Sequence, residues 1–263
     1  METEIKKPFQ KMTTKEIEYT CDRHGKVKAT LFSLNGVFDE SFARCPICEE
    51  EAAAKEEAEQ RERAKRNERM YFENEMQERN IEPEYFDKEL DDFIPETKEQ
   101  AEALSAVKEM IETRKGKIIL LGSNGVGKTM LGSLAVKKLG GKILSMYEIT
   151  TMIRQSYSPK AEKSELEIVK NLASIPLLVI DEMGRTKGSE AELNWLSYIL
   201  DKRHTRQLPF MILSNTHLSR DCPKKGCEMC FERFVNNDVL SRLRQNSKII
   251  SIKAPDYRAR KTK

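Results

Sequence analysis

The sequence predicts an α/β protein with a five-stranded parallel sheet, preceded by a small cysteine-containing module and a charged helix. In the second half of the chain, short apolar runs alternate with helical stretches, which is typical of a parallel sheet covered by helices on both faces. Near the N-terminus, cysteine and histidine residues are grouped as in small metal-binding modules. The segment between these regions is dominated by Glu, Lys, Arg and Ala without Gly or Pro, which favours one long helix.

The length of 263 residues suits one such domain and a smaller accessory region. The net charge of +3 does not predict a nucleic-acid partner, so any basic surface must come from local asymmetry. No apolar run is long enough to span a membrane, and the N-terminus lacks the apolar stretch of a signal peptide. We therefore expect a cytoplasmic protein with no membrane partner. Thiols stay reduced in that compartment, and grouped cysteines there bind metal more often than they form disulfides.

Composition divides the chain into three predicted regions. Residues 1–49 form an N-terminal zinc-binding module, residues 50–80 a charged helical linker, and residues 81–263 the α/β domain. The apolar positions of the linker make no sustained stripe. A solvated linker and a helical arm that contacts a partner protein both fit this pattern.

Within the α/β domain, an amphipathic helix is predicted over 97–114, because Ala101, Leu104, Val107 and Ile111 fall on one face. The apolar runs then predict five strands, at 117–121, 142–145, 176–180, 209–213 and 248–252. Helical patterns follow or separate them, at 128–139, 148–157, 164–173, 191–203 and 238–245.

The first of these strands leads into a complete G-x-x-x-x-G-K-[ST] sequence, which is Gly122-Ser123-Asn124-Gly125-Val126-Gly127-Lys128-Thr129. A strand before this sequence and a helix after it are the context in which it binds nucleotide phosphates. The glycines let backbone N–H groups converge on the phosphates, and the helix dipole adds favourable charge. Lys128 supplies a cation to the phosphates and Thr129 offers a hydroxyl to Mg²⁺. The loop therefore predicts a nucleoside triphosphate and Mg²⁺ as cofactors.

Polar residues at the ends of two later strands complete the predicted site. Asp181 would hold the magnesium ion, directly or through water, and Glu182 would polarise an attacking water molecule, which suits hydrolysis. Asn215 follows the fourth strand and would orient that water or sense the γ-phosphate. An Asn at the end of a strand is also a common turn residue.

The order of these segments resembles the DnaC-type replicative helicase loaders, above all phage and prophage DnaC-like proteins, and the related IstB transposition ATPases. The resemblance covers about residues 81–258 and includes segments 122–129, 177–182, 212–216 and 237–243. It implies an AAA+ ATPase that assembles side by side on single-stranded DNA and places a ring-shaped replicative helicase on it. It also implies that Arg242 is the arginine finger for a neighbouring subunit, with Arg244 as its near competitor. No separate helical lid domain is expected.

Cys21-x-x-His24 and Cys45-x-x-Cys48 form two ligand pairs separated by about 20 residues, at the upper edge of zinc-site spacing. Four protein ligands would complete a tetrahedron, so the predicted site is structural, and so small a module would need the metal to fold. The resemblance implies that this region contacts the helicase. DNA contact is the alternative.

A second group consists of Cys222, Cys227 and Cys230, with His217 shortly before it. Cys227-x-x-Cys230 is one ligand pair, and the other two residues could complete a second zinc site. Free thiols or a redox-sensitive loop fit the less regular spacing as well.

No sequence motif for reading DNA or RNA is visible, so DNA would be contacted mainly at its phosphates. The candidate cations are Arg154, Lys160, Lys163 and Lys170, and Tyr147 and Tyr157 could stack on bases. A solvated basic face with core aromatic residues fits the same pattern. Tyr85 and Phe93 are candidates for the adenine pocket.

Four functions fit these residues. The first is an ATP-dependent loader of a replicative helicase, which hydrolyses ATP at a site shared between subunits. The second is an IstB-like ATPase that directs transposition, and the third a P-loop kinase. The Asp181-Glu182 pair favours attack by water over transfer to a substrate hydroxyl, which speaks against the kinase. The fourth is a nucleotide-gated binding protein with negligible turnover.

Overall fold

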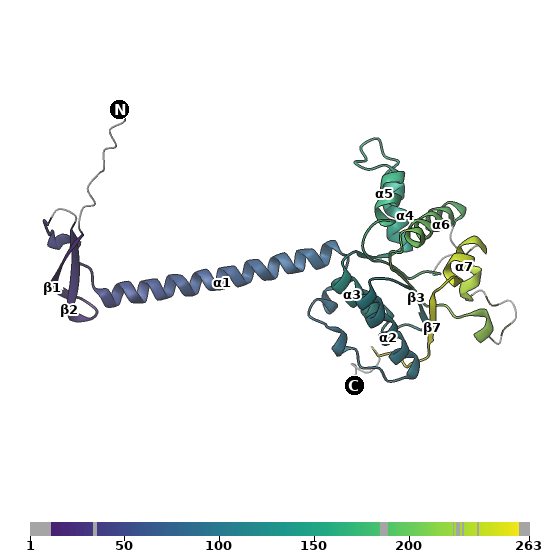
Figure 1. Cartoon of the computed structure of the whole chain (residues 1–263), viewed down its shortest axis with the longest axis horizontal. Helices are drawn as coiled ribbons and strands as arrows, with labels where there is room; N and C mark the ends of the chain where they lie inside the picture. Colours follow the sequence, from purple (N-terminus) through teal and green to yellow (C-terminus); the bar gives the residue numbers. More distant parts are fainter. Residues whose placement is uncertain are drawn as a thin grey trace, which may run out of the picture. The chain divides into compact units, whose positions relative to one another are not determined.

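The computed structural model describes residues 12–33, 36–184, 189–222, 224, 227, 229–235 and 237–257, and for residues 237, 238 and 242 it describes the backbone alone. The chain divides into two compact units, Met1–Tyr71 and Phe72–Lys263 (Figure 1).

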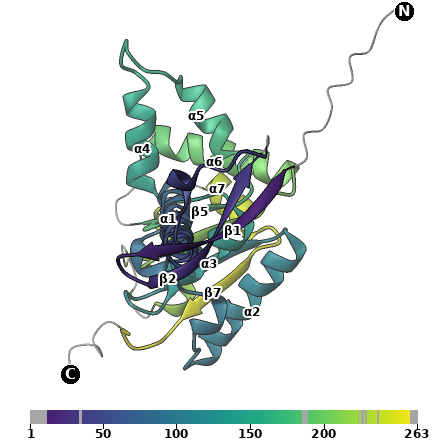
Figure 2. The same ribbon diagram turned by 90° about the vertical axis from the view of Figure 1, so that its left-hand side faces the viewer.

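The first unit is built on an antiparallel hairpin of β1 (Thr13–Cys21) and β2 (Gly25–Ser33). Figure 2 shows the two strands crossing as a twisted pair. Their register pairs Thr13 with Ser33 at the open end and Cys21 with Gly25 at the turn. In the described part of this unit, one face of the hairpin packs into a core of Ala29, Leu31 and Ala43. So small a core provides little hydrophobic stabilisation.

Helix α1 (Pro46–Glu78) follows, as the composition predicts. Pro46 occupies its first position, where the missing N–H forms no helical bond in any case. Almost every side chain up to Tyr71 is exposed, and Met76 is the one buried residue recorded along the helix. From Phe72 onward the helix belongs to the second unit, where Met76 lies in the core and Phe72 packs edge-on against the ring of Phe86.

The second unit contains the predicted five-stranded parallel sheet, in the order β4-β5-β6-β3-β7. Each expected strand is present, but the order of the strands across the sheet differs from their order in the sequence. The strands are β3 (Lys117–Gly122), β4 (Lys142–Ser145), β5 (Leu178–Asp181), β6 (Phe210–Ser214) and β7 (Lys248–Ile252). Strand β6 therefore lies between β5 and β3, and the polar residues that follow these three strands meet at one edge.

Helices cover both faces of the sheet (Figure 1). On one face α2 (Lys98–Thr113) and α3 (Lys128–Leu139) pack on residues such as Ile118, Leu120 and Met211. The other face, with Ile119, Leu121 and Ile212, is covered by α4 (Met146–Gln155), α5 (Glu165–Leu172), α6 (Glu190–Thr205) and α7 (Asn237–Arg244). Alternate residues of a strand point to opposite faces, so a strand buried on both sides is apolar throughout.

The starts of four helices follow from a Ser/Thr-x-x-Glu/Gln pattern. In each case the Ser or Thr side chain accepts a hydrogen bond from the third backbone N–H of the helix. The Glu or Gln side chain in turn accepts from the backbone N–H of the Ser or Thr, which directly precedes the helix. The pairs are Thr97 with Gln100, Ser145 with Glu148, Ser164 with Glu167, and Ser189 with Glu192.

Both views show α4 and α5 as a pair whose connecting loop lies at the far end of the unit from α2. Among the residues that the structure describes, no helix is both long enough and apolar enough to cross a lipid bilayer.

Candidate functional site

The loop between β3 and α3 is shaped by glycines in left-handed conformations. Gly125 has a φ of 74° and Gly127 a φ of 95°, which other residues adopt only with strain. A Cβ on Gly127 would lie 2.4 Å from a ring carbon of Phe93, so the loop also needs glycine there for space. The backbone N–H groups of the loop and of the α3 N-terminus form an anion-binding site.

Lys128 is the first residue of α3, and its side chain turns back into this loop. Its side chain is only 5% exposed. The ammonium Nζ donates hydrogen bonds to the carbonyl oxygens of Gly122 at 2.9 Å and Ser123 at 2.7 Å, and to Asn215 Oδ1 at 2.9 Å. These contacts hold the cation beside the loop on which phosphates would bind.

The structure brings Thr129 and Asp181 together, although they are far apart in the sequence. The Thr129 hydroxyl donates to Asp181 Oδ2 at 2.8 Å. A hydroxyl next to a carboxylate at the phosphate loop is an oxygen donor set suited to Mg²⁺. Burial raises the pKa of the Asp181 carboxyl, although the backbone N–H of Glu182 and the Thr129 hydroxyl favour its charged form.

Glu182 adopts a left-handed backbone conformation with a φ of 53°, which is uncommon for a residue with a side chain. Its backbone N–H donates to Asp181 Oδ1 at 2.6 Å, and its side chain is exposed. Strained residues of this kind are concentrated at functional sites.

Asn215 lies directly beyond β6, the strand between β5 and β3, as expected from its sequence position. The turn around it is fixed by its buried neighbours, since the Ser214 hydroxyl bonds to the Met183 carbonyl and lies 2.8 Å from the Thr216 hydroxyl. Asn215 Oδ1 accepts from Lys128, which links the β6 turn directly to the phosphate loop.

A cleft of about 580 Å³ opens beside this site. It is lined by the loop after β3, the turn after β6 and the segment after β7, namely Gly122, Ser123, Asn215, Thr216, His217, Asp221 and residues 251–255. The segment after β7 then passes over the phosphate loop, where the Tyr257 N–H donates to the Gly125 carbonyl at 3.0 Å. The Asp256 carboxylate lies so close to Gly125 that a Cβ there would overlap it. The sequence shows only a short basic tail here and gives no sign of this contact.

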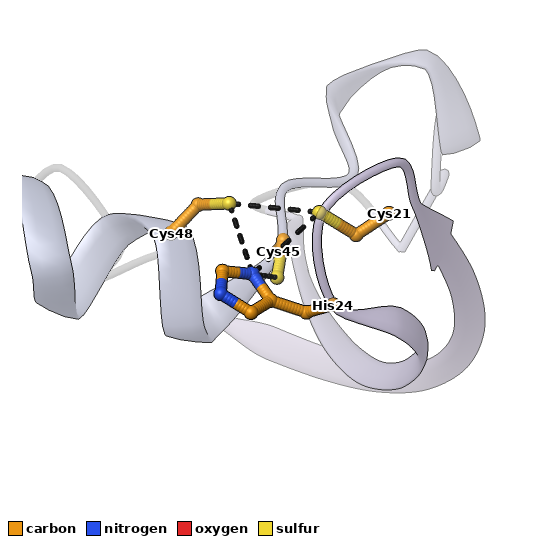
Figure 3. Close-up of side chains that lie close together, drawn as sticks. All are labelled: Cys21, His24, Cys45 and Cys48. Carbon is orange, nitrogen blue, oxygen red and sulfur yellow. Dashed lines mark hydrogen bonds between the residues drawn. The ribbon is translucent and has the colours of Figure 1, made fainter.

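The N-terminal ligand residues converge on one point (Figure 3). Cys21 and His24 come from the hairpin turn, and Cys45 and Cys48 from the start of α1. His24 Nδ1 lies 3.7, 3.6 and 3.3 Å from the sulfurs of Cys21, Cys45 and Cys48. Tetrahedral zinc with ordinary bond lengths separates its ligand atoms by about 3.5–3.8 Å. The donor set and its spacing therefore fit zinc.

Two further features support this metal centre. Backbone N–H groups of Arg23 and His24 lower the pKa of the Cys21 thiol to about 6, which favours a thiolate there, whereas the hydrogen bond to Cys21 raises the pKa of the Cys48 thiol to about 11, so the two sulfurs share a proton when no cation is bound between them. The Glu51 carboxylate lies 3.3 Å from His24 Nε2, the nitrogen that faces away from the sulfurs. A carboxylate in that position orients a metal-binding imidazole. Glu51 has no local signature in the sequence, because it lies within a run of glutamates.

The ligand atoms of His217, Cys222, Cys227 and Cys230 also lie within 4.8 Å of one another.

The predicted DNA-contacting residues lie on or beside the α4–α5 pair. The side chains of Tyr147 and Tyr157 are 79% and 62% exposed, so these two tyrosines are not core aromatic residues. Phe93 is buried against the phosphate loop. Arg242 belongs to α7, and its side chain lies outside the described part of the chain.

Comparison with known proteins finds three informative similarities. The chain is 25% identical over 191 residues to the replicative helicase loader DnaC of Escherichia coli K12, covering 69% of this chain and 74% of that protein. A crystal structure of the DnaC helicase loader matches with a TM-score of 0.52 and 21% identity, over 65% of this chain and all of that one. The replication initiator DnaA, bound to AMPPCP and single-stranded DNA, matches with a TM-score of 0.53 and 21% identity over 66% of this chain.

The two structural matches establish a shared AAA+ fold. The chain spans about half (51%) of the DnaA structure that it matches. A family model for the IstB-like ATP binding proteins matches residues 52–263, which include the phosphate loop, Asp181 and Asn215. The chain therefore belongs to the IstB-like ATP-binding family and is an AAA+ ATPase related to DNA-replication proteins.

Proposed function

We propose that this protein is an ATP-dependent loader that places a replicative helicase on single-stranded DNA. The observation that carries the proposal is the similarity to the replicative helicase loader DnaC, which extends over 74% of that protein. The assembled phosphate site supports the ATP-dependent part, because the loop, Thr129, Asp181 and Asn215 lie together at one edge of the sheet.

In the proposed site, the loop N–H groups and Lys128 bind the phosphates of ATP. Thr129 and Asp181 hold Mg²⁺, which neutralises phosphate charge when bound. Glu182, on the exposed turn after β5, polarises the attacking water, and Asn215 orients it beside Lys128. An acidic residue with solvent access suits attack by water, so hydrolysis is the expected reaction.

We further propose that neighbouring copies share this site, with Arg242 on α7 acting on the ATP bound by the adjacent subunit. An arginine there would stabilise the charge that develops during phosphoryl transfer. Mixing Lys128→Ala subunits with Arg242→Ala subunits should then restore part of the hydrolysis that each variant lacks alone. Arg244→Ala, on the same helix, is the matched control and should retain activity without mixing. Absence of recovery in the mixture, with both variants folded, would contradict a shared site.

We propose that the first unit binds one zinc ion and contacts the helicase. Apolar side chains are exposed on this unit, with Phe32 64% and Phe42 70% accessible, which is a surface suited to a protein partner. Replacing both with Ser should abolish co-elution with the helicase and leave hydrolysis unchanged. The control is Tyr71→Ser, an equally exposed residue of α1. Retained co-elution would place helicase binding elsewhere.

For DNA, the proposed contact surface is the α4–α5 pair. Lys160, Lys163 and Lys170 are exposed on or beside these helices, and Tyr147 and Tyr157 offer rings for stacking on bases. Such a surface would bind single strands with little sequence preference and with strong dependence on salt.

The test of the whole proposal is ATP hydrolysis with and without single-stranded DNA, in the presence and absence of a replicative helicase. Stimulation by DNA, together with a stable complex on the helicase, is the expected result. Stimulation by DNA without helicase binding would favour an IstB-like role in transposition, which the family model also fits. No effect of either would overturn the loader.

A further inference from the structure

We infer that His217, Cys222, Cys227 and Cys230 form a second structural zinc site, which fixes the turn after β6 beside the phosphate loop. Nothing in the ATPase mechanism uses these residues. Four donors from this short segment converge so that their ligand atoms all lie within 4.8 Å. Three sulfurs and one imidazole nitrogen are a common donor set of structural zinc sites.

The spacing of the donors matches zinc geometry. His217 Nε2 lies 3.5 Å from Cys227 Sγ and 3.6 Å from Cys230 Sγ. These distances agree with the separation of about 3.5 Å expected between sulfur and nitrogen ligands in a zinc tetrahedron. The sulfur-to-nitrogen distances at the N-terminal group span 3.3 to 3.7 Å, so the distances from His217 to Cys227 and Cys230 fall in the same range.

The backbone also brings the two ends of this cysteine-containing segment together. His217 and Cys230 are paired by a parallel bridge, in which the His217 N–H donates to the Met229 carbonyl at 3.3 Å and the Phe231 N–H to the His217 carbonyl at 2.8 Å. Beside it, the Glu232 carboxylate accepts from both the N–H and the hydroxyl of Ser219. Backbone and side-chain hydrogen bonds therefore hold the two ends of this segment together.

The position of the site connects it to ATP chemistry. His217 follows Asn215 by two residues, and both line the cleft that also contains Gly122 and Ser123 of the phosphate loop. A metal bound to His217 would hold the turn that presents Asn215 to Lys128. This coupling rests on the proposed role of Asn215 in hydrolysis, whereas metal binding itself does not.

Metal content tests the site first. The purified full chain should carry two zinc ions, and a variant with Cys45→Ser and Cys48→Ser should retain one. Adding Cys227→Ser to that variant should remove the remaining ion. Cobalt substitution gives a second measurement, since the Cys45/Cys48 variant should still show thiolate-to-cobalt absorption from three sulfurs. A folded Cys45/Cys48 variant that binds ATP but carries neither zinc nor cobalt would overturn the second site.

Hydrolysis tests the coupling. With Cys227→Ser in the otherwise unchanged chain, kcat should fall about tenfold or more, because small displacements of a positioning group have large effects on rate. The affinity for ATP should change by less than about threefold, since the phosphate loop itself is intact. Met229→Ala is the matched control, because its side chain in the same loop is 50% exposed. If this variant loses one zinc ion but its kcat is unchanged, the assignment of the metal site stands and its coupling to Asn215 is overturned.

Discussion

Arg203 is a buried cation on α6, and replacing it should destabilise the second unit more than replacing any exposed arginine. Its side chain is fully buried, and within the described part of the chain its terminal nitrogens bond to backbone carbonyls, whereas Nε has no partner. Burial lowers the pKa of its guanidinium to about 10, so the group stays charged at neutral pH. It donates to backbone carbonyls that precede two strands, those of Leu172, Ile175, Pro176 and Pro209.

The size of the effect follows from these four bonds. In an Arg203→Met variant the buried carbonyls of Leu172 and Pro209 lose this donor, and each unsatisfied buried group costs at least about 1 kcal/mol. The bonds to Ile175 and Pro176 are only partly buried, so water can replace part of what they lose. The sum is about 2–4 kcal/mol, a large part of the total stability of a typical domain. With a urea m-value of about 2–3 kcal/mol/M, the unfolding midpoint should fall by about 0.7–2 M.

Trp195, the only tryptophan of the chain, lies on the same helix and provides the assay. Its indole N–H donates to Glu165 at 2.8 Å, so its fluorescence reports unfolding of the second unit alone. Arg206→Met is the matched control, because Arg206 is exposed at the end of α6 and should change stability by no more than about 0.5 kcal/mol. Equal midpoints for the two variants would refute the reasoning.

Three further predictions concern the sites. Asp181→Asn should abolish magnesium-dependent hydrolysis and raise the melting temperature. Because burial raises the pKa of this carboxyl in the folded state, the gain in melting temperature should be small at acidic pH and should grow as the pH rises through the titration of Asp181. A variant less stable than wild type at pH 7 would contradict this prediction. Gly127→Ala should lower affinity for a fluorescent ATP analogue more than tenfold, because the left-handed backbone and the ring of Phe93 leave no room for a methyl group; an unchanged affinity would refute the steric argument. Glu51→Gln should weaken zinc binding at the N-terminal site by about 10- to 100-fold in a chelator competition, because it removes the carboxylate beside His24. Equal zinc affinity of the variant and the wild type would show that Glu51 does not support His24.

Much of the second unit could be predicted from local patterns. Apolar runs such as that before Asp181 are buried on both faces and therefore mark strands without ambiguity. The sequence at Gly122–Lys128 specifies its own loop and helix start, and the position of Asn215 follows once the strands are known. Here local preference and tertiary packing agree.

Other features depend on contacts between distant segments and have no local signature. Arg203 lies in a helix whose pattern is that of a partly solvated surface, so nothing in its neighbourhood predicts burial. The strands of the first hairpin alternate between exposed and more buried side chains, but they contribute only Ala29 and Leu31 to the core, which Ala43 from outside the hairpin completes. The closing of the second cysteine group depends on a backbone bridge between His217 and Cys230, which spacing alone does not show.

The contact between Tyr257 and Gly125 makes residues 253–257 a sensor of the phosphate loop. Any movement of the Gly125 carbonyl when nucleotide binds must either break this hydrogen bond or carry residues 253–257 with it. A fluorophore attached at position 257 would therefore report occupancy of a site whose ligand it never touches. By the same connection, a bulky group fused immediately after this segment would alter nucleotide affinity.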